Sequence, residues 1–131
     1  MDKKGKILIV DDEVDLLETM RFRLETSGYD MAVTPDPKEA MQKAKEHKPG
    51  LILLDIMMPK IDGFTLLKDF KADSETKNIP VIIVSCGKEE EELAKRSLAL
   101  GASGYVVKPF DTASLLFMID KFLQKGETSG V

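Results

Sequence analysis

Short apolar runs alternate with amphipathic stretches along almost the whole chain, and this alternation constrains the fold more than any other feature of the sequence. The runs at 7–10, 51–54 and 80–84 are nearly continuous, as expected for strands buried on both faces of a sheet. The run at 29–34 is less apolar, which favours an edge position, and another run follows at 105–107. After each run, apolar residues recur at helical spacing. The sequence therefore predicts an α/β fold of five βα units, with a parallel sheet and helices on both faces.

Residues with special backbone preferences mark the ends of several predicted helices. Gly28 and Gly101 each follow a helical stretch, in the position where glycine commonly ends a helix. Asp36 and Asp111 each precede one, and an aspartate there can accept hydrogen bonds from the free N–H groups of the first turn. These signals agree with the boundaries that the apolar runs predict.

Composition limits the class of protein. With 43% hydrophobic and 32% charged residues, the chain has the balance of a globular domain. Residues 1–125 are predicted to form one domain, and 126–131 a polar tail. The net charge of −4, with both signs interspersed, argues against direct binding to nucleic acid. A single cysteine, Cys86, and no run suited to a membrane span or a secretion signal favour the cytoplasm.

Polar side chains follow four of the five predicted strands directly. They are Asp11 and Asp12 after the first, Asp55 after the third, Ser85 after the fourth and Lys108 after the fifth. Each has an ordinary structural explanation, as a helix cap, a turn residue or a surface lysine. Because ligands bind at the carboxyl ends of the strands in open α/β sheets, their common position favours a functional site.

The residue types indicate the chemistry of that site. Three neighbouring carboxylates repel one another and need a cation, and oxygen ligands of this kind suit Mg²⁺, which often accompanies phosphate. Lys108 could hold a phosphoryl oxygen as a point charge, and the Ser85 hydroxyl could donate a hydrogen bond to another. Asp55 could then serve as the nucleophile of a phosphoryl transfer. The sequence has no glycine-rich phosphate loop of the P-loop or Rossmann type.

Four motifs together resemble the response-regulator receiver domain (CheY-like) of two-component signalling. They are VDDE at 10–13, LDIMMP at 54–59, DG at 62–63 and KPF at 108–110. The resemblance extends from about Lys6 to Gln124 and includes the spacing from the third-strand aspartate to the serine and the lysine. It implies a flavodoxin-like, doubly wound (βα)5 fold with a five-stranded parallel sheet in the order 2-1-3-4-5.

The resemblance also implies roles for individual residues. Asp55 would accept a phosphoryl group from the phosphohistidine of a sensor histidine kinase or a phosphotransfer protein. Mg²⁺ would be held by Asp11 through water, by Asp12, by Asp55 and by the backbone carbonyl of Met57. Ser85 and Lys108 would contact the phosphoryl oxygens.

Tyr105 occupies the position of a switch aromatic in that family, three residues before Lys108. The resemblance implies that Ser85 moves toward the phosphoryl group while Tyr105 turns inward. This change would repack the fourth helix, the fifth strand and the fifth helix, the face expected to bind a downstream protein. Phosphorylation would shift an existing equilibrium between two states, in a monomer or through a phosphorylation-dependent dimer.

Several functions remain open from the residues alone. The leading interpretation is a phosphorylation-activated switch that acts only on itself and is not an enzyme with a separate substrate. A second is the receiver part of a longer regulator with a DNA-binding or enzymatic output domain. A Mg²⁺-dependent aspartyl-phosphate phosphatase would carry two aspartates separated by one residue after its first strand, whereas Asp11 and Asp12 are adjacent. A flavin carrier would need a phosphate-friendly loop there, but residues 11–13 are all acidic.

Overall fold

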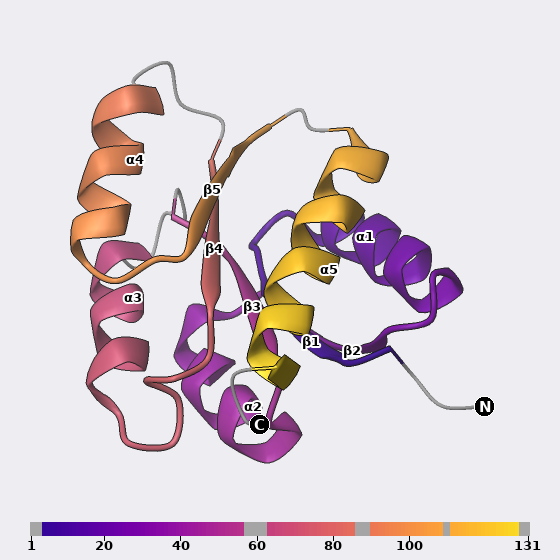
Figure 1. The fold of residues 1–131 in the computed structure, drawn as a ribbon, viewed down its shortest axis with the longest axis horizontal. Coiled ribbons are helices and arrows are strands. Elements are labelled where there is room, and N and C mark those ends of the chain that lie inside the picture. The colour runs from indigo at the N-terminus through magenta and orange to yellow at the C-terminus, as the bar shows by residue number, and fades with distance from the viewer. Residues whose placement is uncertain (1–3, 57–62, 86–89, 109–110, 129–131) are drawn as a thin grey trace.

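A computed structural model describes residues 4–56, 63–85, 90–108 and 111–128. In this part of the chain, strands and helices alternate as the sequence predicts (Figure 1). The elements are β1 (Lys6–Val10), α1 (Val14–Thr26), β2 (Asp30–Thr34), the 3₁₀ turn η1 (Pro37–Glu39), α2 (Ala40–His47), β3 (Leu51–Asp55), α3 (Gly63–Ala72), β4 (Val81–Ser85), α4 (Glu90–Ala99), β5 (Gly104–Val107) and α5 (Thr112–Thr128).

The described strands form one parallel sheet in the order β2-β1-β3-β4-β5, which confirms the predicted doubly wound topology. The pairing register aligns the carboxyl ends of the strands. Val10 lies beside Leu54, so the residues that follow them, Asp11 and Asp55, come next to each other in the same register. Ser85 in turn lies beside Val107 of β5. The register therefore gathers the polar residues at one edge of the sheet.

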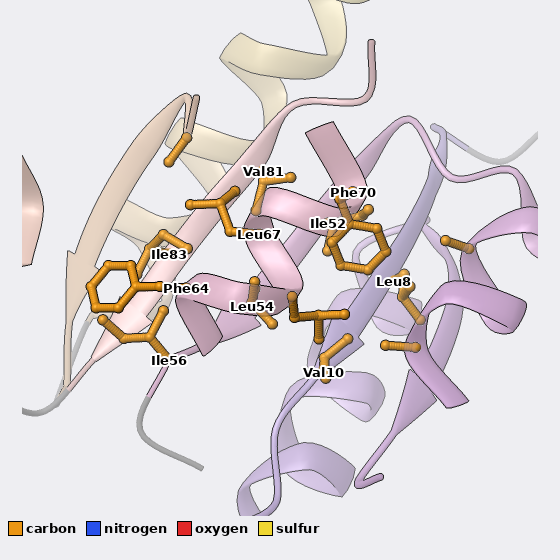
Figure 2. Packing of buried hydrophobic residues seen from close by; sticks show 14 residues of the cluster. Leu8, Val10, Ile52, Leu54, Ile56, Phe64, Leu67, Phe70, Val81 and Ile83 are labelled. Carbon is orange, nitrogen blue, oxygen red and sulfur yellow. The ribbon is translucent and has the colours of Figure 1, made fainter. Parts of the chain in front are cut away.

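Both faces of the sheet are covered, and this explains why the central strands are apolar throughout. α1 and α5 pack on one face and α2, α3 and α4 on the other (Figure 1). Successive strand residues point to opposite faces, so each central strand contributes to two cores. Figure 2 shows the core beneath α3, where Leu54, Phe64 and Ile83 pack together. All five residues of β3 and of β4 are buried.

β2 lies at an edge of the sheet, as its weaker hydrophobicity predicts. Four of its five residues are only half-buried, because no strand lies beyond it in the described sheet. β5 forms the other edge, and its four residues are half-buried as well. Among the described residues, no helix is both long and apolar enough to cross a membrane.

The predicted helix ends are found close to their expected places. Gly28 and Gly101 both have a φ of +104°, a left-handed conformation that glycine adopts without strain. Asp36 accepts a hydrogen bond from the backbone N–H of Lys38 at 2.9 Å and so begins η1, which leads into α2. α5 continues to Thr128, so the helix extends into the segment at 126–131 that was predicted as a polar tail.

Gly63 brings the start of α3 against the end of β3, and we expect Gly63→Ala to destabilise the fold. A methyl group at Gly63 would lie 2.3 Å from the Cα atom of Ile56, a backbone atom that cannot move aside alone. The expected loss in the free energy of unfolding is about 3 kcal/mol, measured by urea denaturation.

Gly104→Ala is the matched control. Its methyl group would lie 3.4 Å from Phe122, an ordinary contact, so the change in the free energy of unfolding should stay below about 1 kcal/mol. Equal losses for the two variants would show that the close approach of α3 to β3 carries no particular constraint.

Candidate functional site

The polar residues that were predicted to form a site meet at the carboxyl edge of the sheet. Asp11, Asp55 and Ser85 are buried, with exposed fractions of 2%, 3% and 0%. Asp12 is more open to solvent than either of the other two aspartates. One carboxylate oxygen from each of the three aspartates lies within 4.8 Å of the others. The structure thus brings together side chains that are 44 residues apart in the chain, since Asp11 and Asp55 follow neighbouring strands.

Asp11 organises the loop between β1 and α1. Its Oδ1 atom accepts a hydrogen bond from the backbone N–H of Glu13 at 2.9 Å, and its Oδ2 atom accepts one from the Lys108 ammonium at 2.9 Å. The N-cap residue, directly before α1, is Glu13, and its own side chain makes no capping hydrogen bond. Asp11 therefore supports the start of α1 from outside the cap position, and its second oxygen holds the lysine.

Lys108 follows the edge strand β5, and its side chain extends along the carboxyl ends of the strands to the acidic cluster. Its side chain is only 10% exposed, and its ammonium lies 2.9 Å from Asp11, 3.1 Å from Glu13 and 3.6 Å from Asp55. Burial on its own would lower the pKa of this ammonium. The hydrogen bond to Asp11 and the attraction of Asp55 outweigh that effect and raise the pKa of Lys108 well above its ordinary value.

Ser85 ends β4 between the acids and the lysine. Its carbonyl accepts a hydrogen bond from the backbone N–H of Lys108 at 2.6 Å, which ties the end of β5 to the end of β4. Tyr105 pairs with Ile83 and packs against the core on the side of α2, α3 and α4. The Tyr105 hydroxyl is buried and has no hydrogen-bond partner within the described parts of the chain.

Some sequence predictions cannot be compared with this geometry. Met57, whose backbone carbonyl was predicted as a metal ligand, lies outside the described residues, as does Cys86. Conversely, the sequence predicted no role for Glu13, although this residue belongs to the VDDE motif at 10–13. A third acidic residue directly after the aspartate pair could have indicated a role in the site. Its contact with Lys108, however, depends on the conformation of the loop between β1 and α1, which the sequence pattern does not specify.

The donor set fits a hard divalent cation. The cluster offers carboxylate oxygens, the ligands that Mg²⁺ prefers, and the more open Asp12 leaves one side accessible to water. The single charge of Lys108 offsets only part of the negative charge of the neighbouring carboxylates of Asp11, Asp12, Asp55 and Glu13, and a divalent cation would offset more of it. The residues present therefore suit a magnesium ion at this edge of the sheet.

Fold and site together define a class: an open α/β sheet of order 2-1-3-4-5 with an acidic cluster and a lysine at its carboxyl edge. The family model of the response regulator receiver domain matches residues 7–120. The chain belongs to this family, the receiver domains of two-component response regulators, which are phosphorylation-dependent switches.

Individual relatives agree with the family. The chain is 37% identical, over 93% of its length, to the alkaline phosphatase synthesis transcriptional regulatory protein PhoP of Bacillus subtilis, of which it covers 50%. It is 35% identical, over 92% of its length, to the phosphate regulon transcriptional regulatory protein PhoB of Escherichia coli, of which it covers 52%. The chain thus spans about half the length of the curated relatives it matches.

A solved structure of similar length supports the fold. The CheY-like response regulator receiver domain protein of Methanospirillum hungatei superposes with a TM-score of 0.85 at 30% identity. The match covers 98% of this chain and 99% of that one. The likeness therefore includes almost the whole of both chains.

Lys108 should make the stability of the fold depend on pH in the alkaline range. Its pKa is higher in the folded chain than the ordinary value of 10.5, so the folded state holds the proton more tightly. The resulting stabilisation is complete below the unfolded-state pKa and is lost as the pH rises through the folded-state pKa. The difference in the free energy of unfolding between wild type and Lys108→Met should be constant from about pH 7 to about pH 10 and shrink above that, in urea denaturation series.

The variant Lys38→Met removes one positive charge from an exposed position and serves as the control for net charge. The same pH profile for the two variants would contradict the contacts assigned to Lys108.

Proposed function

We propose that Asp55 is the phosphoacceptor of this receiver domain and that Mg²⁺ is required for its phosphorylation. One observation carries the proposal: the buried Asp55 carboxylate lies both in a cluster with Asp11 and Asp12 and 3.6 Å from the Lys108 ammonium. A nucleophilic oxygen, a candidate metal site and a positive charge are thereby joined in one place. Phosphoryl transfer depends mainly on positioning and on neutralisation of charge, and this arrangement provides for both.

The transfer itself is a simple exchange of bonds. A carboxylate oxygen of Asp55 forms a bond to phosphorus while the phosphorus–nitrogen bond of a phosphohistidine breaks, and its electron pair returns to the imidazole. Asp12, Asp55, Asp11 through water and the Met57 carbonyl would hold Mg²⁺. When bound, Mg²⁺ supplies the positive charge that lets an anionic phosphoryl group approach three carboxylates.

Lys108 and Ser85 would hold the phosphoryl oxygens after transfer. The Lys108 side chain is 10% exposed and its ammonium already lies 3.6 Å from Asp55, so it needs to move little to contact a group bound there. Ser85 is fully buried at the adjacent strand end, where its hydroxyl could donate to a second oxygen. Electrostatic contacts are stronger in such a dry environment than in water.

We propose Ser85 and Tyr105 as the switch residues. The buried Tyr105 hydroxyl has no hydrogen-bond partner among the residues described, an arrangement that costs free energy. A second orientation of this ring in which the hydroxyl finds a hydrogen-bond partner would recover part of that cost. Movement of Ser85 toward a phosphoryl group would favour that second state and change the surface formed by α4, β5 and α5.

We further propose that a sensor histidine kinase or a phosphotransfer protein supplies the phosphoryl group in the cytoplasm. The changed surface would then bind a downstream protein. The receiver domain would act either as a monomer or as a phosphorylation-dependent dimer. A longer regulator is the second candidate, because the chain matches about half of transcriptional regulators such as PhoP and PhoB. Because the whole chain carries a net charge of −4 with both signs interspersed along the sequence, the receiver domain itself would not contact nucleic acid.

Phosphorylation can be tested with acetyl phosphate and Mg²⁺, followed by intact mass. We expect wild type to gain one phosphoryl group and Asp55→Asn to gain none, because the amide is not a nucleophile. Asp15→Asn, an exposed position in the first turn of α1, is the control and should be modified like wild type. An adduct of equal yield on Asp55→Asn would overturn the assignment.

The metal site can be tested separately by the effect of Asp12→Asn on Mg²⁺ binding, measured by titration calorimetry. Loss of one carboxylate should weaken binding by roughly tenfold or more. Without Mg²⁺ the same variant should be more stable than wild type by about 1 kcal/mol, because one repelling charge is gone. Unchanged Mg²⁺ affinity, relative to Asp15→Asn, would exclude Asp12 as a ligand.

A further inference from the structure

The Lys108 ammonium is held asymmetrically among its three acidic neighbours. It donates hydrogen bonds to Asp11 at 2.9 Å and to Glu13 at 3.1 Å, whereas Asp55 lies at 3.6 Å, beyond the usual range of a hydrogen bond. The two shorter contacts both come from the loop between β1 and α1. They draw the ammonium toward the start of α1 and away from the carboxylate proposed as the phosphoacceptor.

Two backbone hydrogen bonds fix the position of Glu13. Its N–H donates to the Asp11 carboxylate at 2.9 Å, and its carbonyl accepts the N–H of Leu17 at 2.9 Å as α1 begins. Asp11 therefore holds the backbone of Glu13 with one oxygen and the Lys108 ammonium with the other. This shared anchor brings the Glu13 side chain within reach of Lys108.

The two acids that hold Lys108 differ in their exposure. The Asp11 side chain is 3% exposed, and that of Glu13 is 59% exposed. Water screens the contact with Glu13, so this contact is weaker than the buried one and can be released first. The exposed Glu13 carboxylate also adds a negative charge beside Lys108, and this charge would repel an anionic phosphodonor.

We infer that Glu13 is a positioning residue that restrains Lys108 at the start of α1 until a phosphoryl group on Asp55 competes for its ammonium. This inference rests on the proposed function of Asp55. Before Lys108 can contact a phosphoryl oxygen, it must weaken one of its two hydrogen bonds, and the exposed one to Glu13 is the one it gives up. Glu13 thus slows phosphorylation of this site and favours the unphosphorylated arrangement.

An ordinary structural role makes a different prediction. An acid at the beginning of a helix interacts favourably with the helix dipole, whichever position in the first turn it occupies. Under that explanation, Glu13→Gln and Asp15→Asn would have similar effects, and Glu13→Asp, which keeps the charge, would behave like wild type. If Glu13 holds Lys108, Glu13→Asp should instead resemble Glu13→Gln, because its carboxylate is set back by about 1.5 Å.

The first measurement compares phosphorylation rates with acetyl phosphate at saturating Mg²⁺ and fixed ionic strength. We expect the maximal rate to rise roughly fivefold in Glu13→Gln, the effect of losing one charge-assisted hydrogen bond at an exposed carboxylate. Glu13→Asp should also be faster than wild type. Asp15→Asn, which removes a charge from the same helical turn without touching Lys108, should change the rate less than about twofold.

The second measurement does not depend on phosphorylation. In protein labelled with ¹⁵N-lysine, the Lys108 ammonium should give an NMR signal protected from exchange with water, assigned by its absence in Lys108→Arg. The signal should exchange with water faster in Glu13→Gln and Glu13→Asp, because one of its two hydrogen bonds is gone, and should be unchanged in Asp15→Asn.

The outcomes separate this inference from the proposed function. Wild-type rates in both Glu13 variants, or a protected Lys108 signal that neither variant changes, would overturn the role of Glu13 and leave Asp55 as the phosphoacceptor. If wild type accepts no phosphoryl group at all, the proposed function fails and the role of Glu13 fails with it.

Discussion

The contact between Lys108 and Asp11 joins two strands that are not neighbours, and the arrangement of charged residues at the carboxyl edge of the sheet depends on it. Lys108 follows β5 and Asp11 follows β1. The lysine side chain therefore reaches past the ends of β4 and β3, which lie between these two strands in the sheet. Both side chains are nearly buried, and each would be costly without the other because an isolated charge is poorly solvated there. The carboxylates of Asp55 and Glu13 are drawn into the same arrangement.

The surrounding fold confines polar side chains of the central strands to the strand ends, including the carboxyl edge of the sheet. The central strands are covered on both faces by helices, so their side chains must be apolar along their length. Charged groups can enter only where the strands end, and a parallel sheet aligns all of those ends. The close packing of Gly63 against Ile56 keeps the start of α3 near the same edge. The fully buried strands β3 and β4 thus hold Asp55 and Ser85, whereas Tyr105 lies on the half-buried edge strand β5.

Much of this architecture could be predicted from the sequence because it depends on local patterns. Apolar runs located the strands, the weaker run at 29–34 marked the edge, and Gly28 and Gly101 ended their helices. The helical continuation past Gly126 was not predicted, since a polar segment carries little local signal for where a helix ends. Asp11, Asp55, Ser85 and Lys108 could be predicted as site residues for the same local reason, because each directly follows an apolar run. The roles predicted for Met57 and Tyr105 came only from the resemblance to the family.

By itself, the sequence determined the five βα units, the parallel sheet and the set of polar residues at its carboxyl edge. These follow from hydrophobic periodicity and from the position of each polar residue after a strand. Only the tertiary structure decided that the Lys108 ammonium hydrogen-bonds Asp11 and Glu13 and stays farther from Asp55. The physical reason is that these contacts join residues more than 90 positions apart in the chain and depend on side-chain orientation within tenths of an ångström. No periodicity in the sequence encodes such a distance.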